Sequence, residues 1–155
     1  MEIERSVLQV LLLVGVAFSA TVCYAVLYQI PKQALLLVGC VGLGAWLVQY
    51  ISLQLWTSPV FAALLGGVFV GGASEKLARM MRMPVTVFVV GGIVPLVPGS
   101  SAMATMREFV MGNYLEGLSR GTLTMLIASA ISAGLVLAGS LLRQDRRGKR
   151  ARKSQ

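Results

Sequence analysis

The segment best suited to binding a ligand is the run P-L-V-P-G-S-S, which begins at Pro95 and ends at Ser101. Pro95 and Pro98 each remove one backbone N–H and crowd the carbonyl oxygen four residues earlier, so a helix cannot pass through them unchanged. Gly99 has access to backbone conformations that are closed to other residues. Ser100 or Ser101 offers a side-chain oxygen that caps a new helix. The run therefore predicts a helix broken at Pro95–Gly99, with a second half that starts near Ser101.

A broken helix of this kind has a definite chemical use. Backbone N–H groups at a helix start carry partial positive charge and bind anions. At membrane depth, each unpaired backbone group costs several kcal/mol unless protein or water satisfies it, so unwound backbone there normally lines a cavity. We therefore predict a substrate site at Pro95, Pro98, Gly99, Ser100 and Ser101 that receives a carboxylate. The alternative is a proline kink that only shapes helix packing.

The second candidate is Glu75, which lies close to the interior of an apolar segment and one helical turn before Arg79. The four-residue spacing predicts an ion pair at the membrane interface. The other interpretation is a carboxylate that carries a proton in a cavity, because ionisable groups near a membrane interior are often functional.

Enzymatic chemistry finds little support. The chain contains no histidine, which removes Ser-His and Cys-His nucleophiles and histidine-based metal sites. Cys23 and Cys40 stand singly within apolar blocks, as small buried residues do. We expect no enzyme activity, no cofactor and no metal.

The elements that carry these residues are membrane helices. Of the 155 residues, 56% are hydrophobic and 13% are charged, and mean hydropathy is +0.77. A soluble domain averages about 25% charged residues, whereas a membrane span needs about 20 apolar residues. The apolar blocks predict an all-α integral membrane protein, a single domain over 1–142 with a basic tail over 143–155. About five spans are expected, at 6–28, 33–53, 57–76, 84–106 and 117–142.

The distribution of charge predicts how the spans are oriented. Seven of the fourteen Lys and Arg residues lie in the tail. If the tail is cytoplasmic, Lys32 and the cations between Lys76 and Arg82 share its side, which brings the count there to eleven. The positive-inside rule then places the N-terminus outside and the C-terminus in the cytoplasm. The tail is expected to contact anionic lipid headgroups, and nucleic-acid binding is not expected.

Small residues recur every four positions on two of the predicted spans. Such a stripe lies on one face of a helix and permits close contact between helices. We predict packing faces, within this chain or toward a partner, at Ala63, Gly67 and Gly71 and at Ala130, Gly134 and Ala138.

The region from Glu75 to Met106 contains S-E-K-L-A-R, R-M-P-V-T-V-F and G-G-I-V-P-L-V-P-G-S. It resembles the C-terminal membrane half of the threonine/serine exporter family, and the segment from Tyr24 to Leu35 resembles that family's first loop. The resemblance implies an inner-membrane system, driven by the proton gradient, that exports threonine, serine or a related small metabolite. It also implies a larger membrane subunit as partner. It transfers no residue roles.

Three other interpretations remain open. A half-helix start suits the carboxylate of a dicarboxylic acid as well as that of an amino acid. The chain could also be a scaffold or assembly subunit that does not touch substrate, which needs only the small-residue stripes. A holin-like pore former is the third.

Overall fold

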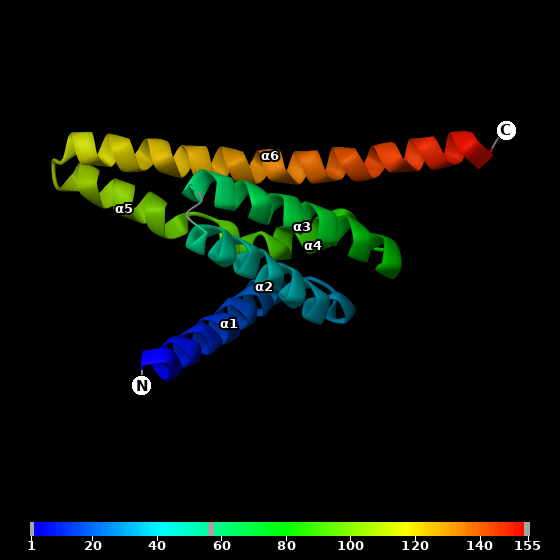
Figure 1. The fold of residues 1–155 in the computed structure, drawn as a ribbon, viewed down its shortest axis with the longest axis horizontal. Coiled ribbons are helices and arrows are strands. Elements are labelled where there is room, and N and C mark those ends of the chain that lie inside the picture. The colour runs from blue at the N-terminus through cyan, green and yellow to red at the C-terminus, as the bar shows by residue number, and fades with distance from the viewer. Residues whose placement is uncertain (1, 56–57, 154–155) are drawn as a thin grey trace.

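The computed structural model describes the backbone of residues 2–55 and 58–153 and the side chains of residues 12–55 and 58–141. Within these ranges every regular element is a helix, as the composition predicts (Figure 1). The elements are α1 (Glu2–Leu27), α2 (Lys32–Gln54), α3 (Pro59–Met81), α4 (Val85–Gly92), the short 3-10 helix η1 (Val94–Leu96), α5 (Gly99–Val110) and α6 (Tyr114–Lys153).

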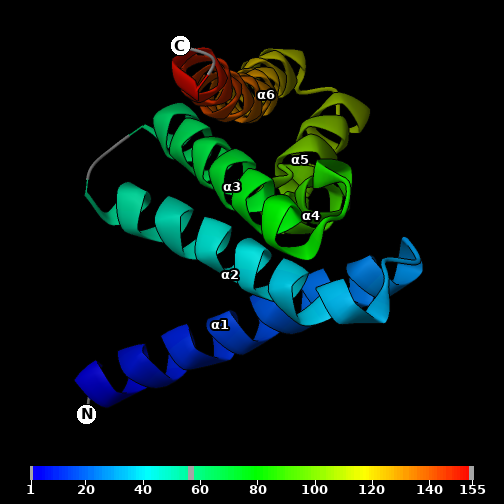
Figure 2. The same ribbon diagram turned by 90° about the vertical axis from the view of Figure 1, so that its right-hand side faces the viewer.

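The helices lie in layers beside one long helix. α6 runs along one side of the molecule, and α3 packs directly against it (Figures 1 and 2). α2 lies beyond α3 and α4, and α1 lies farthest from α6 (Figure 2). α5 forms a hairpin with the start of α6, and none of its residues is buried.

The contact between α3 and α6 is made by backbone as well as by side chains. A methyl group on Gly67 would lie 2.6 Å from the carbonyl oxygen of Ile131. A methyl group on Gly134 would lie 2.8 Å from the backbone nitrogen of Val68. Both stripes of small residues therefore face this contact, with Ala63, Ala130 and Ala138 buried in it. Glycine allows the two helices to approach this closely.

By length and composition, α2, α3 and Tyr114–Leu141 of α6 can each cross a membrane. The pair Val85–Leu96 and Gly99–Val110 makes a fourth crossing if it is one bent span, and Leu12–Leu27 is a shorter apolar helix. Thr57, where the third span was expected to begin, lies outside the described residues.

The basic tail predicted over 143–155 begins within a helix. α6 begins at Tyr114 and continues as one helix through the basic residues to Lys153. Leaving the apolar region changes the solvent but does not end a helix. Residues 143–153 contain no proline and one glycine, so nothing in their sequence stops the helix there.

The turns between α1 and α2 and between α3 and α4 are alike. Each holds a non-glycine residue in the left-handed conformation, Gln29 or Arg82, both with φ 55°. In each turn the next residue donates its N–H to the carbonyl oxygen five positions back. Ile30 donates to Ala25 (3.0 Å), and Met83 donates to Ala78 (3.1 Å). A proline follows each donor, Pro31 in the first turn and Pro84 in the second. Corresponding residues are 53 positions apart. The molecule thus contains two similar helical hairpins, α1–α2 and α3–α4.

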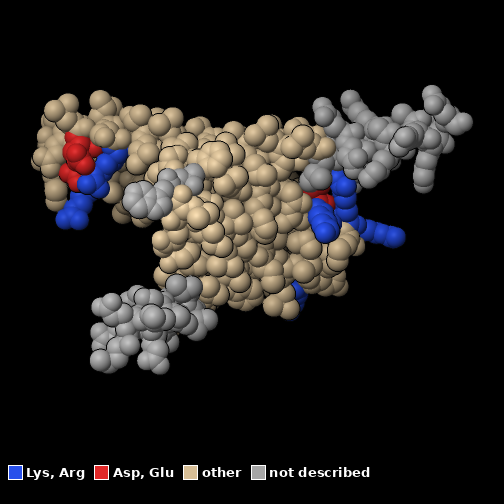
Figure 3. Space-filling model, in the orientation of Figure 1, with Lys and Arg blue, Asp and Glu red and all other residues tan. Residues whose placement is uncertain are grey.

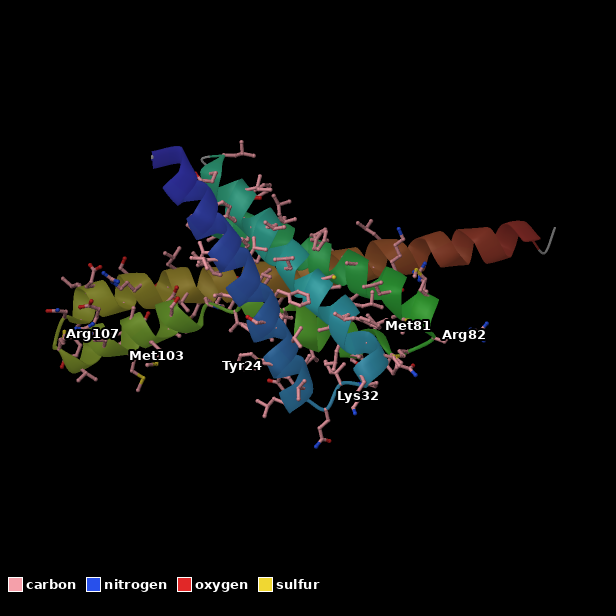
Figure 4. The ribbon with its side chains drawn as sticks, turned by 90° about the horizontal axis from the view of Figure 1, so that it is seen from below. Tyr24, Lys32, Met81, Arg82, Met103 and Arg107 are labelled. Atoms are coloured by element: carbon pink, nitrogen blue, oxygen red, sulfur yellow. The ribbon has the colours of Figure 1, made fainter. Side chains whose placement is uncertain are left out.

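Charged side chains gather at the two ends of the molecule, and the middle carries none on the face drawn in Figure 3. One end holds Arg107 and the other holds Lys32 and Arg82 (Figure 4). At the first end, Arg120 pairs with Glu116 (3.0 Å) and approaches Glu108 of α5 (3.9 Å). An uncharged middle between two charged ends is the arrangement that a bilayer requires.

Candidate functional site

The helix expected over 84–106 is broken where the prolines predict. α4 ends at Gly92, η1 covers Val94–Leu96, and α5 begins at Gly99. The two halves meet at an angle of 50°. Val97, which precedes Pro98, is extended with φ −62° and ψ 125°, as steric contact with a following proline favours.

The detail of the new helix start corrects the expectation. Pro98 occupies the N-cap position, and no side chain caps α5, so the predicted cap at Ser100 or Ser101 is wrong. α5 begins at Gly99, which does not have positive φ. Proline and glycine thus start the helix two residues earlier than expected. Both serines consequently fall inside its first turn, where they cannot act as N-cap residues.

Two of the backbone N–H groups at the start of α5 already make hydrogen bonds within the chain. The N–H of Gly99 donates to the carbonyl of Val97 (2.8 Å), and the N–H of Ala102 donates to the carbonyl of Pro98 (3.0 Å). The N–H groups of Ser100 and Ser101 make no hydrogen bond with any described residue. Ser100 is exposed and Ser101 is half-buried. The first turn therefore offers two backbone donors and two hydroxyl groups.

The depth of the break can be measured against α6. Leu96 packs on α3 at Gly66, and the next residue of α3 packs on Ile131 of α6. Ile131 stands 11 residues after Arg120 and 12 before Arg143, with no charged residue between. Each interval is about 16–18 Å at 1.5 Å per residue, and a bilayer core is about 30 Å thick. The break therefore lies halfway along the uncharged length of the molecule.

A pocket of about 510 Å³ opens beside the break. Pro95 and Gly99 line it, whereas Pro98, Ser100 and Ser101 do not. The remaining lining residues are Val94 and Val97 from the break, Leu13, Val16, Ala17, Ala20 and Tyr24 from α1, Tyr28 from the following turn, and Trp46 from α2.

The pocket wall formed by α1 and α2 was not predicted. Tyr24 lies between the two charged ends of the molecule (Figure 4). In the sequence, Tyr24 and Trp46 are single aromatic residues inside apolar blocks, with no spacing that links them to the prolines. The only available signal was a tryptophan far from both ends of its predicted span, since membrane aromatics concentrate at the interfaces.

Glu75 is 7% exposed and accepts a hydrogen bond from the Arg79 guanidinium, with 2.9 Å between Oε1 and Nη2. The ion pair predicted by the spacing is therefore present. Glu75 also faces a second cavity of about 450 Å³ between α3, α4 and α6. The other residues that line this cavity are Gly71, Val85, Val89, Leu135, Val136, Gly139 and Ser140.

The two candidate sites are separate. Glu75 follows Gly66 by nine positions along α3, which is about 13 Å. The break lies at the level of Gly66 and at the middle of the uncharged length. Glu75 and Ser140 line one cavity, and they stand seven positions before Arg82 and three before Arg143, so this cavity lies toward the charged end that holds Arg82.

A helix interrupted halfway along an uncharged length, with free backbone donors beside a pocket, is the arrangement of a membrane transporter. Residues 13–141 match the family model described as "Threonine/Serine exporter, ThrE". This chain belongs to the threonine/serine exporter family. It is a membrane protein of a family of transporters rather than of enzymes.

A curated relative from Corynebacterium glutamicum, named threonine/serine exporter, is 29% identical over 98 residues. These residues make up 63% of this chain and 20% of the relative. The chain thus spans about a fifth of the length of that relative. No solved structure matches this chain.

Proposed function

We propose that this chain is the small subunit of a two-component exporter, driven by the proton gradient, for threonine, serine or a related small carboxylate metabolite. It would act in the cytoplasmic (inner) membrane as a five-span protein, with the N-terminus outside and the C-terminus in the cytoplasm. The observation that carries the proposal is the break at half depth, where the unpaired N–H groups of Ser100 and Ser101 stand at the start of α5.

The substrate carboxylate is assigned to this first turn. Gly99 and Pro95 border the pocket, so a ligand inside it lies next to the start of α5. The N–H groups of Ser100 and Ser101 would donate hydrogen bonds to the carboxylate, and their hydroxyls would add two more donors. The positive end of a helix contributes about 0.3–1 kcal/mol, and up to about 2 kcal/mol when partly buried.

The five spans follow if α1 crosses the membrane together with α2, α3, the broken helix and α6. The α1–α2 turn and the α3–α4 turn then lie on the side where the basic part of α6 emerges. Lys32 and Arg82 are at the same end of the molecule, which supports this arrangement (Figure 4). The tail cations would contact anionic lipid headgroups on that side; their side chains lie outside the described residues.

Glu75 is proposed as the residue that carries the coupling proton. Its carboxylate is nearly buried, faces a cavity and is paired with the neighbouring Arg79. Buried ionisable groups near membrane interiors commonly serve proton transfer. The Glu75→Gln variant should keep its fold and lose the dependence of export on the proton gradient.

A second, larger membrane subunit is proposed as the partner. The curated relative named as an exporter is about three times as long as this chain, and the matched part is about a fifth of it. The rest of the transport machinery would then come from another polypeptide.

The test is efflux of preloaded labelled threonine and serine from cells that express this chain, its larger partner, both or neither. Export that requires both chains is the expected result. If the complex assembles but exports neither amino acid, labelled dicarboxylates are the next substrates to load. Failure with these as well would support the scaffold interpretation.

Alanine at both Ser100 and Ser101 separates a substrate-lining subunit from a scaffold. We expect the double variant to lose most export while the complex still assembles. The matched control is Ser129→Ala with Ser132→Ala, two exposed serines on α6 whose hydroxyls bond only to carbonyls of their own helix. Equal export from both double variants would show that the Ser100 and Ser101 hydroxyls do not contribute to the substrate site.

A further inference from the structure

We propose that Trp46 binds the ammonium group of a zwitterionic amino acid whose carboxylate lies at the start of α5, and that it thereby selects amino acids over dicarboxylates. This inference rests on the proposed function. It adds a specificity-determining residue from α2, outside the broken helix.

The depth of Trp46 is the first observation. Its neighbour Ala45 lies beside α3 at Gly66, which is also where Leu96 packs. Trp46 is therefore at the level of the break, halfway along the uncharged length of the molecule. Tryptophan in membrane proteins is enriched at the two interfaces, so an interfacial role does not account for this position.

The position of the ring is the second observation. Trp46 lines the pocket together with Pro95, Val97 and Gly99. Its ring stacks on Tyr50 with 5.1 Å between centroids and 16° between planes, which holds the indole in one orientation. The residue is half-buried, and its indole N–H makes no hydrogen bond within the described part of the chain.

The charge of the pocket is the third observation. None of its lining residues is charged. A second carboxylate on the substrate would therefore face apolar and aromatic side chains without a cation. An ammonium group is instead attracted to the negative face of an aromatic ring, and tryptophan gives the strongest such interaction. The ion pair Glu75–Arg79, in which only Glu75 is buried, is about 13 Å farther along α3.

The experiment compares L-threonine with 2,3-dihydroxybutyrate, in which a hydroxyl replaces the ammonium group. Binding is measured by calorimetry on the complex with its larger partner in lipid nanodiscs, with malate as a third ligand. Threonine should bind roughly 2- to 30-fold more tightly than 2,3-dihydroxybutyrate, the range that a cation–π contact supplies. Malate should bind more weakly than threonine.

Substitution at Trp46 gives the decisive comparison. Trp46→Leu should abolish the preference for threonine and leave the affinity for 2,3-dihydroxybutyrate unchanged, and Trp46→Phe should keep part of the preference. The control is Phe61→Leu, an exposed aromatic residue of α3 that lines neither cavity. If Trp46 had a purely structural role, Trp46→Leu would lower the affinities for threonine and 2,3-dihydroxybutyrate equally. That result would overturn the proposal.

Two further results would also overturn it: an unchanged preference in Trp46→Leu, or the absence of measurable binding to the unmodified complex. Threonine efflux from cells is recorded in parallel. Efflux with an unchanged preference in Trp46→Leu would reject the role of Trp46 and leave the exporter assignment standing. The expected binding pattern without efflux would reject export and leave the ammonium site standing.

Discussion

The hairpins α1–α2 and α3–α4 share their turn, yet only the second contains a broken helix. α2 runs without interruption for 23 residues, whereas α4 ends after eight. At positions 53 apart, Gly42 and Ala45 of α2 correspond to Pro95 and Pro98. Because the turns are alike, we attribute the break to the two prolines rather than to the architecture of the hairpin.

The hairpins differ a second time at a buried hydroxyl. Thr21 and Ser74 are also 53 positions apart, and both are fully buried. The Thr21 hydroxyl donates to the carbonyl of Ala17 (2.7 Å). The Ser74 hydroxyl is the one buried side-chain polar atom in the described residues that has no hydrogen-bond partner. The second hairpin therefore carries two features that reduce stability, and the substrate site is proposed in the same hairpin.

The largest effect is expected from giving α2 the proline of α4. Gly42→Pro removes a backbone hydrogen bond and places ring atoms against Thr21, whose side chain would lie 2.6 Å from even a methyl group there. Unfolding in mixed micelles, followed by circular dichroism, should show a loss of at least about 3 kcal/mol. Gly15→Ala, where a methyl group meets nothing within 4 Å, is the control and should show no loss.

The reverse exchange gives α4 the residues of α2. In the Pro95→Gly, Pro98→Ala variant the backbone N–H groups return, so we expect a continuous helix and a smaller bend than 50°. Spin labels at positions 87 and 106 should lie farther apart, toward the roughly 28 Å of a straight helix. Export should fall at least about tenfold, or about 1.4 kcal/mol, because the free donors disappear.

The labels require a background without Cys23 and Cys40, the two cysteines of the chain. Pro84→Ala is the matched control, since Pro84 only precedes α4 and should not alter the label distance. An unchanged distance in the double variant would show that packing, and not proline, maintains the break.

The two buried hydroxyls should respond in opposite directions. Ser74→Ala removes an unpartnered group and should raise the free energy of unfolding by about 1 kcal/mol. Thr21→Val removes a hydroxyl that has its hydrogen bond and should lower it by about 1 kcal/mol. The same micelle assay measures both. Effects of the same sign would mean that Ser74 finds a partner in the membrane.

The smallest effect is expected where the hairpins agree. Gln29 and Arg82 adopt a left-handed conformation that glycine reaches without steric cost. Gln29→Gly and Arg82→Gly should each raise the free energy of unfolding by about 0.5 kcal/mol. This net gain is the relief of the left-handed strain less the greater conformational entropy of glycine in the unfolded chain. Alanine at either position should give no gain. A gain in only one turn would show that the hairpins are not equivalent.

Several features followed from single residues and their near neighbours. Pro95 and Pro98 lack the N–H that a helix needs, so the break was predictable at residue resolution. The ion pair of Glu75 and Arg79 was predictable because residues four positions apart are neighbours on one face of a helix. The serine cap was missed because Pro98 and Gly99 started α5 two residues earlier, a competition between neighbouring caps that residue preferences do not resolve.

The sequence by itself determined the helical membrane class, the position of the break and the small-residue stripes, because proline geometry, apolar length and glycine spacing act locally along the chain. Only the tertiary structure decided what faces the break. Trp46 and Tyr24 reach the pocket because α1 and α2 pack beside η1, and Glu75 reaches its cavity because α4 and α6 enclose it. Contacts between helices distant in sequence depend on the fit of many side chains at once, which no single segment encodes.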